Sequence, residues 1–212
     1  MRFEQSIQPF AGQLLTQAIL MDLLKEYRWP HNKIRGLEKQ EMLTPLKRGL
    51  YITGPALKLP RPSAYLMANH IYGPSYVSME AALSYWGLIP EKVVNTSSMT
   101  TGSSRNFRTA AGLFSYIKTR LPYYSFGIRQ VEMSADQTVL MASPEKALCD
   151  VIVTKPGMIL RSANQALEFL VEDMRMEKPA LQELNNEAIK SWIAYAPKKS
   201  SIRMVTKTLD KL

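Results

Sequence analysis

The apolar positions between residues 14 and 27 recur at helical spacing without a Gly or Pro among them, which predicts one helix over that range. Pro30 should end it, because the residue before a proline is biased away from helical angles. A second short helix is expected over residues 31–42, where Ile34 and Leu37 mark successive turns. The apolar positions of the first helix are Leu15, Ile19, Leu23 and Leu24.

Two short extended runs follow, at residues 43–46 and 50–53, on either side of the tripeptide Lys47-Arg48-Gly49. Glycine tolerates the positive φ that a tight hairpin needs. The order helix, turn, helix, hairpin predicts a winged helix-turn-helix unit of the kind that binds DNA.

Residues 57–62 (LKLPRP) hold two prolines in six positions, which indicates a linker and a domain boundary near residue 62. We therefore expect a winged-helix domain over 1–62 and an α+β domain over 63–212.

The charge distribution agrees with this division. Residues 1–62 carry ten Lys and Arg against five Asp and Glu, residues 63–197 twelve against twelve, and residues 198–212 five against one. The net charge of +9 therefore comes entirely from the two ends. A basic region beside a neutral body is typical of polyanion binding, although solvated lysines need no partner.

The second part mixes helical and extended patterns, which predicts an α+β domain with a mixed or antiparallel sheet and C-terminal helices. Ser78, Ser143 and Ser162 stand where they can cap helices, and Gly87 can close one in a left-handed conformation. Helices are expected over residues 62–69, 78–86, 143–153, 162–174 and 179–194, and extended segments over 93–97, around 107, and over 113–118, 125–132 and 138–141.

The second helix and the hairpin tip supply the candidate DNA-binding residues. Asparagine and arginine can read base edges, whereas lysines mostly meet phosphate. The alternative is a solvated helix face and a polar turn. The candidates are Asn32, Lys33, Arg35, Lys39, Lys47 and Arg48.

The C-terminal tail places Ile202, Val205, Leu209 and Leu212 on one helical face against a basic face. Such a helix could dock on the domain and add positive charge beside the DNA, bind a partner, or solubilise the end, and the sequence does not decide among these. The basic residues are Lys198, Lys199, Arg203, Lys207 and Lys211.

Enzyme chemistry finds little support. Cys149, the single cysteine, cannot form an intramolecular disulfide or a cysteine zinc site, and His70 has no recognisable nucleophile beside it. The loop 102–105 (GSSR) resembles an anion-binding loop, but four-residue matches of this kind are frequent by chance.

Residues 143–150 (SPEKALCD) are best explained as the start of a capped helix that turns Ala147, Leu148 and the following Val151 to the core. We expect no enzyme, cofactor, metal or membrane segment, and a cytoplasmic protein.

Three stretches together resemble the abortive-infection antitoxin family of AbiEi type, the antitoxin half of type IV toxin–antitoxin systems. They are 46–52 (LKRGLYI), 76–88 (YVSMEAALSYWGL) and 142–150 (ASPEKALCD). Their order and spacing match over about residues 14–155. One departure is that only fifteen residues separate Tyr27 from Leu43, less than the family's usual room for two helices.

The resemblance implies a repressor of its own operon that binds inverted repeats in double-stranded promoter DNA. It also implies a C-terminal domain that neutralises a nucleotidyltransferase-like toxin without a stable complex. Two alternatives stay open: a stand-alone winged-helix transcriptional regulator with no toxin partner, and an interaction module whose winged helix binds protein.

Overall fold

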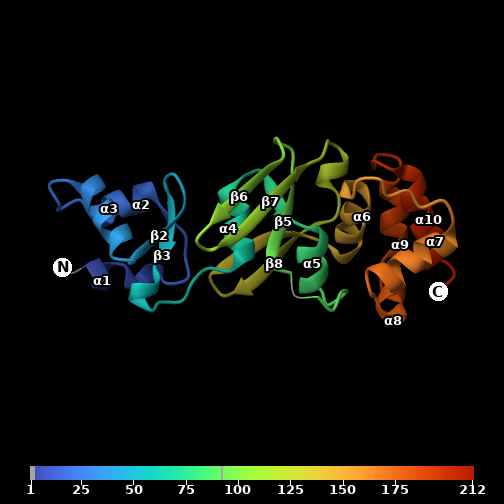
Figure 1. Cartoon of the computed structure of the whole chain (residues 1–212), viewed down its shortest axis with the longest axis horizontal. Helices are drawn as coiled ribbons and strands as arrows, with labels where there is room; N and C mark the ends of the chain where they lie inside the picture. Colours follow the sequence, from blue (N-terminus) through green and yellow to red (C-terminus); the bar gives the residue numbers. More distant parts are fainter. Residues whose placement is uncertain (1–2, 92) are drawn as a thin grey trace.

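The computed structural model describes residues 3–91 and 93–212. Figure 1 shows an elongated chain with an N-terminal helical unit at one end, a central sheet flanked by helices, and a group of C-terminal helices at the other end. The chain is α+β, as the sequence predicts, with a three-stranded antiparallel sheet and a six-stranded mixed sheet in the described residues.

The N-terminal unit packs short helices on the small sheet, whose strand order is β1-β3-β2. The predicted hairpin is confirmed, with its turn at Arg48 and Gly49. The elements are α1 (Phe3–Ser6), η1 (Gln8–Phe10), β1 (Leu15–Thr16), α2 (Gln17–Leu23), α3 (Pro30–Lys39), β2 (Leu43–Lys47), β3 (Leu50–Thr53) and η2 (Pro55–Leu57).

The helix predicted over residues 14–27 is wrong at both ends. Leu15 lies in β1, where it pairs with Tyr51 of β3, and α2 begins only after Thr16, whose hydroxyl accepts a hydrogen bond from the Ile19 amide at 3.3 Å. Strand pairing to a segment 36 residues away is invisible to local periodicity. Pro30 does not end this helix but occupies the first turn of α3, where its missing N–H costs nothing.

The hairpin joins the two parts of the chain. The N-terminal unit has its own apolar core, but Leu46, Leu50 and Ile52 of the hairpin belong to the larger core of the second part. That N-terminal core consists of Phe3, Ile7, Leu15, Leu20, Leu24, Ile34, Leu37 and Leu43.

The proline-rich stretch has no helix or strand from residue 58 to 63, as expected of a linker, but it is held in place. The Gln137 side chain donates to the Gly12 carbonyl at 3.0 Å and accepts from the Ser63 amide at 2.9 Å. The Gly12 amide in turn donates to the Pro60 carbonyl at 2.9 Å. The division of the chain at residue 62 stays a prediction.

The six-stranded sheet has the order β6-β7-β5-β4-β9-β8. The β4–β9 and β5–β7 pairs are parallel, and the others are antiparallel. Every predicted extended segment lies at least partly in a strand, and β4 was not predicted. The strands are β4 (Ser75–Val77), β5 (Asn95–Thr100), β6 (Arg105–Thr109), β7 (Gly112–Lys118), β8 (Ile128–Ser134) and β9 (Gln137–Ala142), with η3 (Tyr123–Ser125) before β8.

Helix α4 packs on β4, β5 and β9, whereas α5 packs on β5 and α6. Helix α6 in turn contacts α9 and α10 of the C-terminal group. The predicted caps at Ser143 and Ser162 are confirmed, because their hydroxyls accept from the amides three residues on. The single helix predicted over 179–194 is wrong: it is two helices, and Asn185 caps the second. The helices are α4 (Ala64–Ile71), α5 (Met79–Tyr85), α6 (Pro144–Thr154), α7 (Ala163–Glu168), the π turn η4 (Phe169–Asp173), α8 (Lys178–Gln182), α9 (Asn186–Trp192) and α10 (Lys199–Leu209).

Candidate functional site

Helix α3 presents a polar face to solvent. Ile34 and Leu37 are 4 % and 1 % exposed and point into the N-terminal core. The 3.6-residue period puts Asn32, Arg35 and Lys39 on the opposite side, and all three side chains are exposed. Three of the six candidate residues therefore share one open face of one helix.

The hairpin tip lies beside the start of this helix. The Gln17 amide donates to the Gly49 carbonyl at 2.9 Å, and the Gln17 side-chain nitrogen lies 3.4 Å from Nδ1 of His31, in the first turn of α3. Gly49 adopts a φ of +78°, and its neighbour Arg48 is exposed. Gln17 thus brings Arg48 near the polar face of α3. Sequence reasoning missed Gln17, because its role depends on two segments far from it in the chain.

Lys33 points to a different side of α3 from Arg35. Its ammonium lies 5.1 Å from the centroid of the Tyr27 ring, and the residue is half-buried. A cation over an aromatic face is held electrostatically by the ring quadrupole. The Lys33 side chain therefore lies over Tyr27, in the turn between α2 and α3, and flanks the exposed face.

Lys47 lies at the hairpin as predicted, and its side chain extends to the end of α4. Its ammonium donates to the carbonyls of Ile71 at 2.7 Å and His70 at 3.0 Å, at the end of α4. Helix C-termini leave carbonyls without intrahelical partners and attract cations. Burial and the Lys47 charge together lower the pKa of His70. Lys47 therefore fastens the hairpin to the second part of the chain.

The basic tail folds as α10. Ile202 and Val205 are buried, and the helix packs against α7 and α9, so docking on the domain is confirmed. Figure 1 places α10 at the opposite end of the chain from α3. Its exposed cations therefore do not lie beside the α3 face, contrary to one of the alternatives. These cations are Lys199, Arg203, Lys207 and Lys211.

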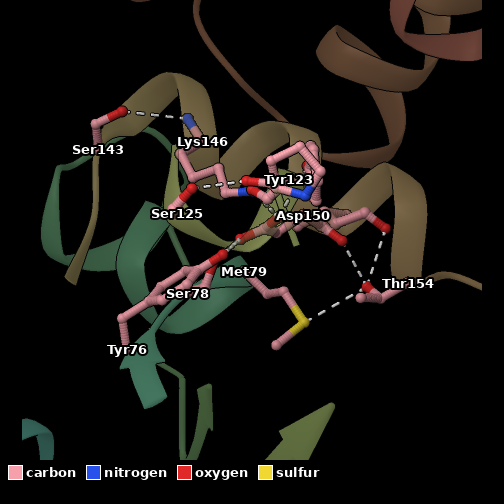
Figure 2. Close-up of polar contacts among 11 residues, drawn as sticks. Tyr76, Ser78, Met79, Tyr123, Ser125, Ser143, Lys146, Asp150 and Thr154 are labelled. Carbon is pink, nitrogen blue, oxygen red and sulfur yellow. Dashed lines mark hydrogen bonds and ion pairs between the residues drawn. The ribbon is translucent and has the colours of Figure 1, made fainter. Parts of the chain in front are cut away.

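A second cluster of polar side chains lies inside the molecule, around Asp150 (Figure 2). Its carboxylate accepts hydrogen bonds from Tyr76 at 3.0 Å, Ser78 at 2.7 Å and Tyr123 at 2.9 Å, and its Oδ1 is 3.1 Å from the ammonium of Lys146. Asp150 and Lys146 both have 0 % exposed side chains. We expected Ser78 to cap α5, and this is wrong: its hydroxyl donates to Asp150 instead.

Burial governs the electrostatics of this cluster. It lowers the pKa of Lys146, against the opposing pull of Asp150, and raises the pKa of Tyr123 well above its ordinary value. The Lys146 ammonium lies 3.1 Å from the centroid of the Tyr123 ring and donates to the Tyr123 carbonyl at 2.9 Å. Burying an ion pair costs desolvation energy, which is offset only if the remaining lone pairs and protons are hydrogen-bonded. The surrounding hydroxyls donate to the carboxylate and so offset part of that cost.

The interpretation of residues 143–150 as a capped helix is confirmed in part. Ala147, Leu148 and Val151 are buried as expected. The charged residues of the same segment, which we did not expect in the core, are buried too: Glu145, Lys146 and Asp150. Burial raises the pKa of the Cys149 thiol to about 12, so the thiol is neutral near pH 7.

A hollow of about 430 Å³ lies on β5, β6 and β7. The Asn95 side chain donates to the Ser115 hydroxyl across it at 2.8 Å. Among the described residues, no histidine, cysteine, lysine or carboxylate lines it, so it offers no base beside a nucleophile. Its lining residues are Asn95, Asn106, Phe107, Arg108, Leu113, Phe114 and Ser115.

Within residues 3–91 and 93–212, no group of three or more His, Cys, Asp or Glu side chains could hold a metal ion. In the same ranges, none of the helices has the length and apolar character needed to cross a membrane. Neither a protein-family model nor a curated protein sequence matches this chain.

Proposed function

We propose that the chain is a DNA-binding transcriptional repressor whose N-terminal unit is a winged helix. The observation that carries the proposal is the contact of Gln17 with both Gly49 and His31, which gathers the hairpin tip and α3 on one surface. The element order from α1 through β1, α2, α3 and the β2–β3 hairpin supports it. In this proposal the hairpin is the wing and α3 is the recognition helix.

The exposed face of α3 has the chemistry for duplex recognition. Asn32 and Arg35 enter the major groove and can form bidentate hydrogen bonds with adenine and guanine edges. Lys39, further along the helix, and Arg48, at the wing tip, meet phosphates. Lys33 and Lys47 are left out of the groove contacts, because the first lies over Tyr27 and the second binds the end of α4.

A mobility shift of the full chain on its own upstream DNA tests this proposal. Arg48→Ala should weaken binding and lower the salt slope, log K against log salt, by about 0.9 for the phosphate that it no longer neutralises. Arg35→Ala should weaken binding by about 1–3 kcal/mol and relax the preference for the base that it contacts. Lys207→Ala on α10 is the matched control, since it removes an exposed cation at the far end of the chain, and it should bind as the parent does. Failure of the parent chain to shift the DNA at low salt would refute the repressor.

We further propose that the chain is the antitoxin of a type IV toxin–antitoxin system and represses its own operon at inverted repeats. The support is the three-stretch resemblance and the way two of those stretches meet. Tyr76 and Ser78 of the second bond to Asp150 of the third, and the Trp86 indole donates to the Ala142 carbonyl at 2.8 Å. These two stretches therefore contact each other in the fold, in part through the buried cluster around Asp150.

Co-expression with a nucleotidyltransferase-like toxin encoded beside this gene tests the antitoxin role. The parent chain should restore growth, and Arg35→Ala should do so as well, because the rescue does not depend on the DNA face. DNA binding without rescue would leave a stand-alone regulator. Intact binding of a protein partner by the Arg35→Ala, Arg48→Ala double variant, with no DNA binding by the parent, would favour an interaction module.

A further inference from the structure

The turn between α2 and α3 exposes two aromatic rings. Trp29, the residue before α3, is 65 % exposed, and Tyr27 is 38 % exposed. An indole is a large apolar surface, and leaving it in water forgoes the burial that usually stabilises such a side chain. The apolar contacts of this helix are made by Ile34 and Leu37, so the Trp29 ring contributes little to the core.

Each of these rings carries a cation. The Arg28 guanidinium lies 5.5 Å from the Trp29 centroid, and the Lys33 ammonium lies 5.1 Å from the Tyr27 centroid. In the part of the chain that the structure describes, neither cation has a carboxylate within 4 Å. We call Tyr27, Arg28, Trp29 and Lys33 the aromatic corner.

Alternating rings and unpaired cations fit a ligand that is itself part apolar and part anionic. The sugar–phosphate backbone of DNA is such a ligand, since its deoxyribose presents apolar surface between phosphates. The corner adjoins the N-terminal end of α3, the end that approaches the groove in helix-turn-helix proteins. A bilayer or a protein partner would gain less from the corner, because it is small and two of its four side chains are cations.

We infer that the aromatic corner clamps one DNA backbone at the edge of the groove that α3 enters. Trp29 packs against a deoxyribose, and Arg28 and Lys33 contact the phosphates on either side of it. The inference rests on the proposed winged-helix function and adds a contact with a deoxyribose to the phosphate contacts of Lys39 and Arg48. Phosphate and sugar contacts of this kind set register rather than sequence preference.

The test is a titration of the full chain with a short duplex of its own upstream DNA, followed by tryptophan emission and by affinity at several salt concentrations. The duplex should change the emission of the parent chain but not of Trp29→Phe, because Trp86 and Trp192 are partly buried and lie outside the corner. Trp29→Ala should weaken affinity about tenfold with an unchanged salt slope. Arg28→Ala should instead lower the slope by about 0.9, as expected for one phosphate contact.

Tyr195→Ala is the matched control, because Tyr195 is an aromatic residue 56 % exposed among the C-terminal helices, and its removal should leave the affinity unchanged. The inference is overturned if Trp29→Ala binds as the parent does while Arg35→Ala binds weakly. A preference of the parent for single-stranded over duplex DNA, abolished in Trp29→Ala, would also overturn it, since it would indicate stacking on an unpaired base. If the parent binds no duplex at all, the proposed function itself fails.

Discussion

Asp150→Asn should destabilise the fold strongly, because Asp150 is the acceptor for every donor in the buried cluster. Its carboxylate, 0 % exposed, receives three hydroxyl hydrogen bonds and faces the Lys146 ammonium at 3.1 Å. An asparagine removes the negative charge and turns an NH2 group toward donors that it cannot accept from. The ammonium is then buried without a counter-charge.

Removing one partner of a buried ion pair costs roughly 3–5 kcal/mol in the free energy of unfolding. With an m value of about 2–3 kcal/mol per molar, the urea midpoint should fall by about 1–2.5 M. Lys146→Met should cost less than Asp150→Asn, because the carboxylate keeps its three hydroxyl donors. Asp136→Asn, on the exposed β8–β9 turn, is the control and should change stability by less than about 0.5 kcal/mol.

The pH dependence provides a second check. Burial already lowers the pKa of Lys146 from its ordinary 10.5, and Asp150 opposes that shift, so the pKa should fall further in Asp150→Asn. Between this lowered pKa and 10.5 the unfolded chain binds more protons than the folded one, and stability then rises with pH. The deficit of the variant should therefore shrink as the pH is raised from below that window into it. A decrease below about 1 kcal/mol at unchanged m, or a deficit that grows with pH, would refute the reasoning.

Three further predictions concern single positions. Gly127→Ala should cost about 1–3 kcal/mol in urea unfolding, because its φ is +61° and a new Cβ would lie 2.7 Å from the Lys146 Cβ; an unchanged midpoint would contradict this. Cys149 should resist alkylation at pH 8 in the native chain and react on unfolding in urea, since burial raises its pKa to about 12, and rapid native labelling would count against it. Lys47→Met should raise the pKa of His70, because it removes a nearby positive charge that helps to lower it. An NMR titration measures this pKa, with the His70 signal assigned by comparison with His70→Gln. An unchanged pKa would mean that burial alone lowers the pKa of His70.

The sequence by itself determined the features that arise from neighbouring residues. Ser143 and Ser162 cap their helices as predicted, because each hydroxyl accepts from an amide only three residues away. The hairpin around Gly49 and the α+β class also follow from local turn chemistry and apolar spacing.

The part of the candidate site that lies on α3 could likewise be predicted. Asn32, Arg35 and Lys39 were singled out from one helical pattern, and they share one exposed face because a helix repeats every 3.6 residues. The neighbouring Lys33 and the hairpin residue Lys47 could not be assigned in this way. Their positions depend on Tyr27 and on the end of α4.

Only the tertiary structure decided which polar groups are buried. Ser78 looks like a cap in the sequence, but its hydroxyl bonds to Asp150, 72 residues further on. The segment around Lys146 looks polar, but the ammonium is buried between the Asp150 carboxylate, one turn further along α6, and the carbonyl and ring of Tyr123 from η3. Local patterns report how a residue suits its neighbours in the chain, whereas the cost of burying a charge is set by partners that only folding brings into contact.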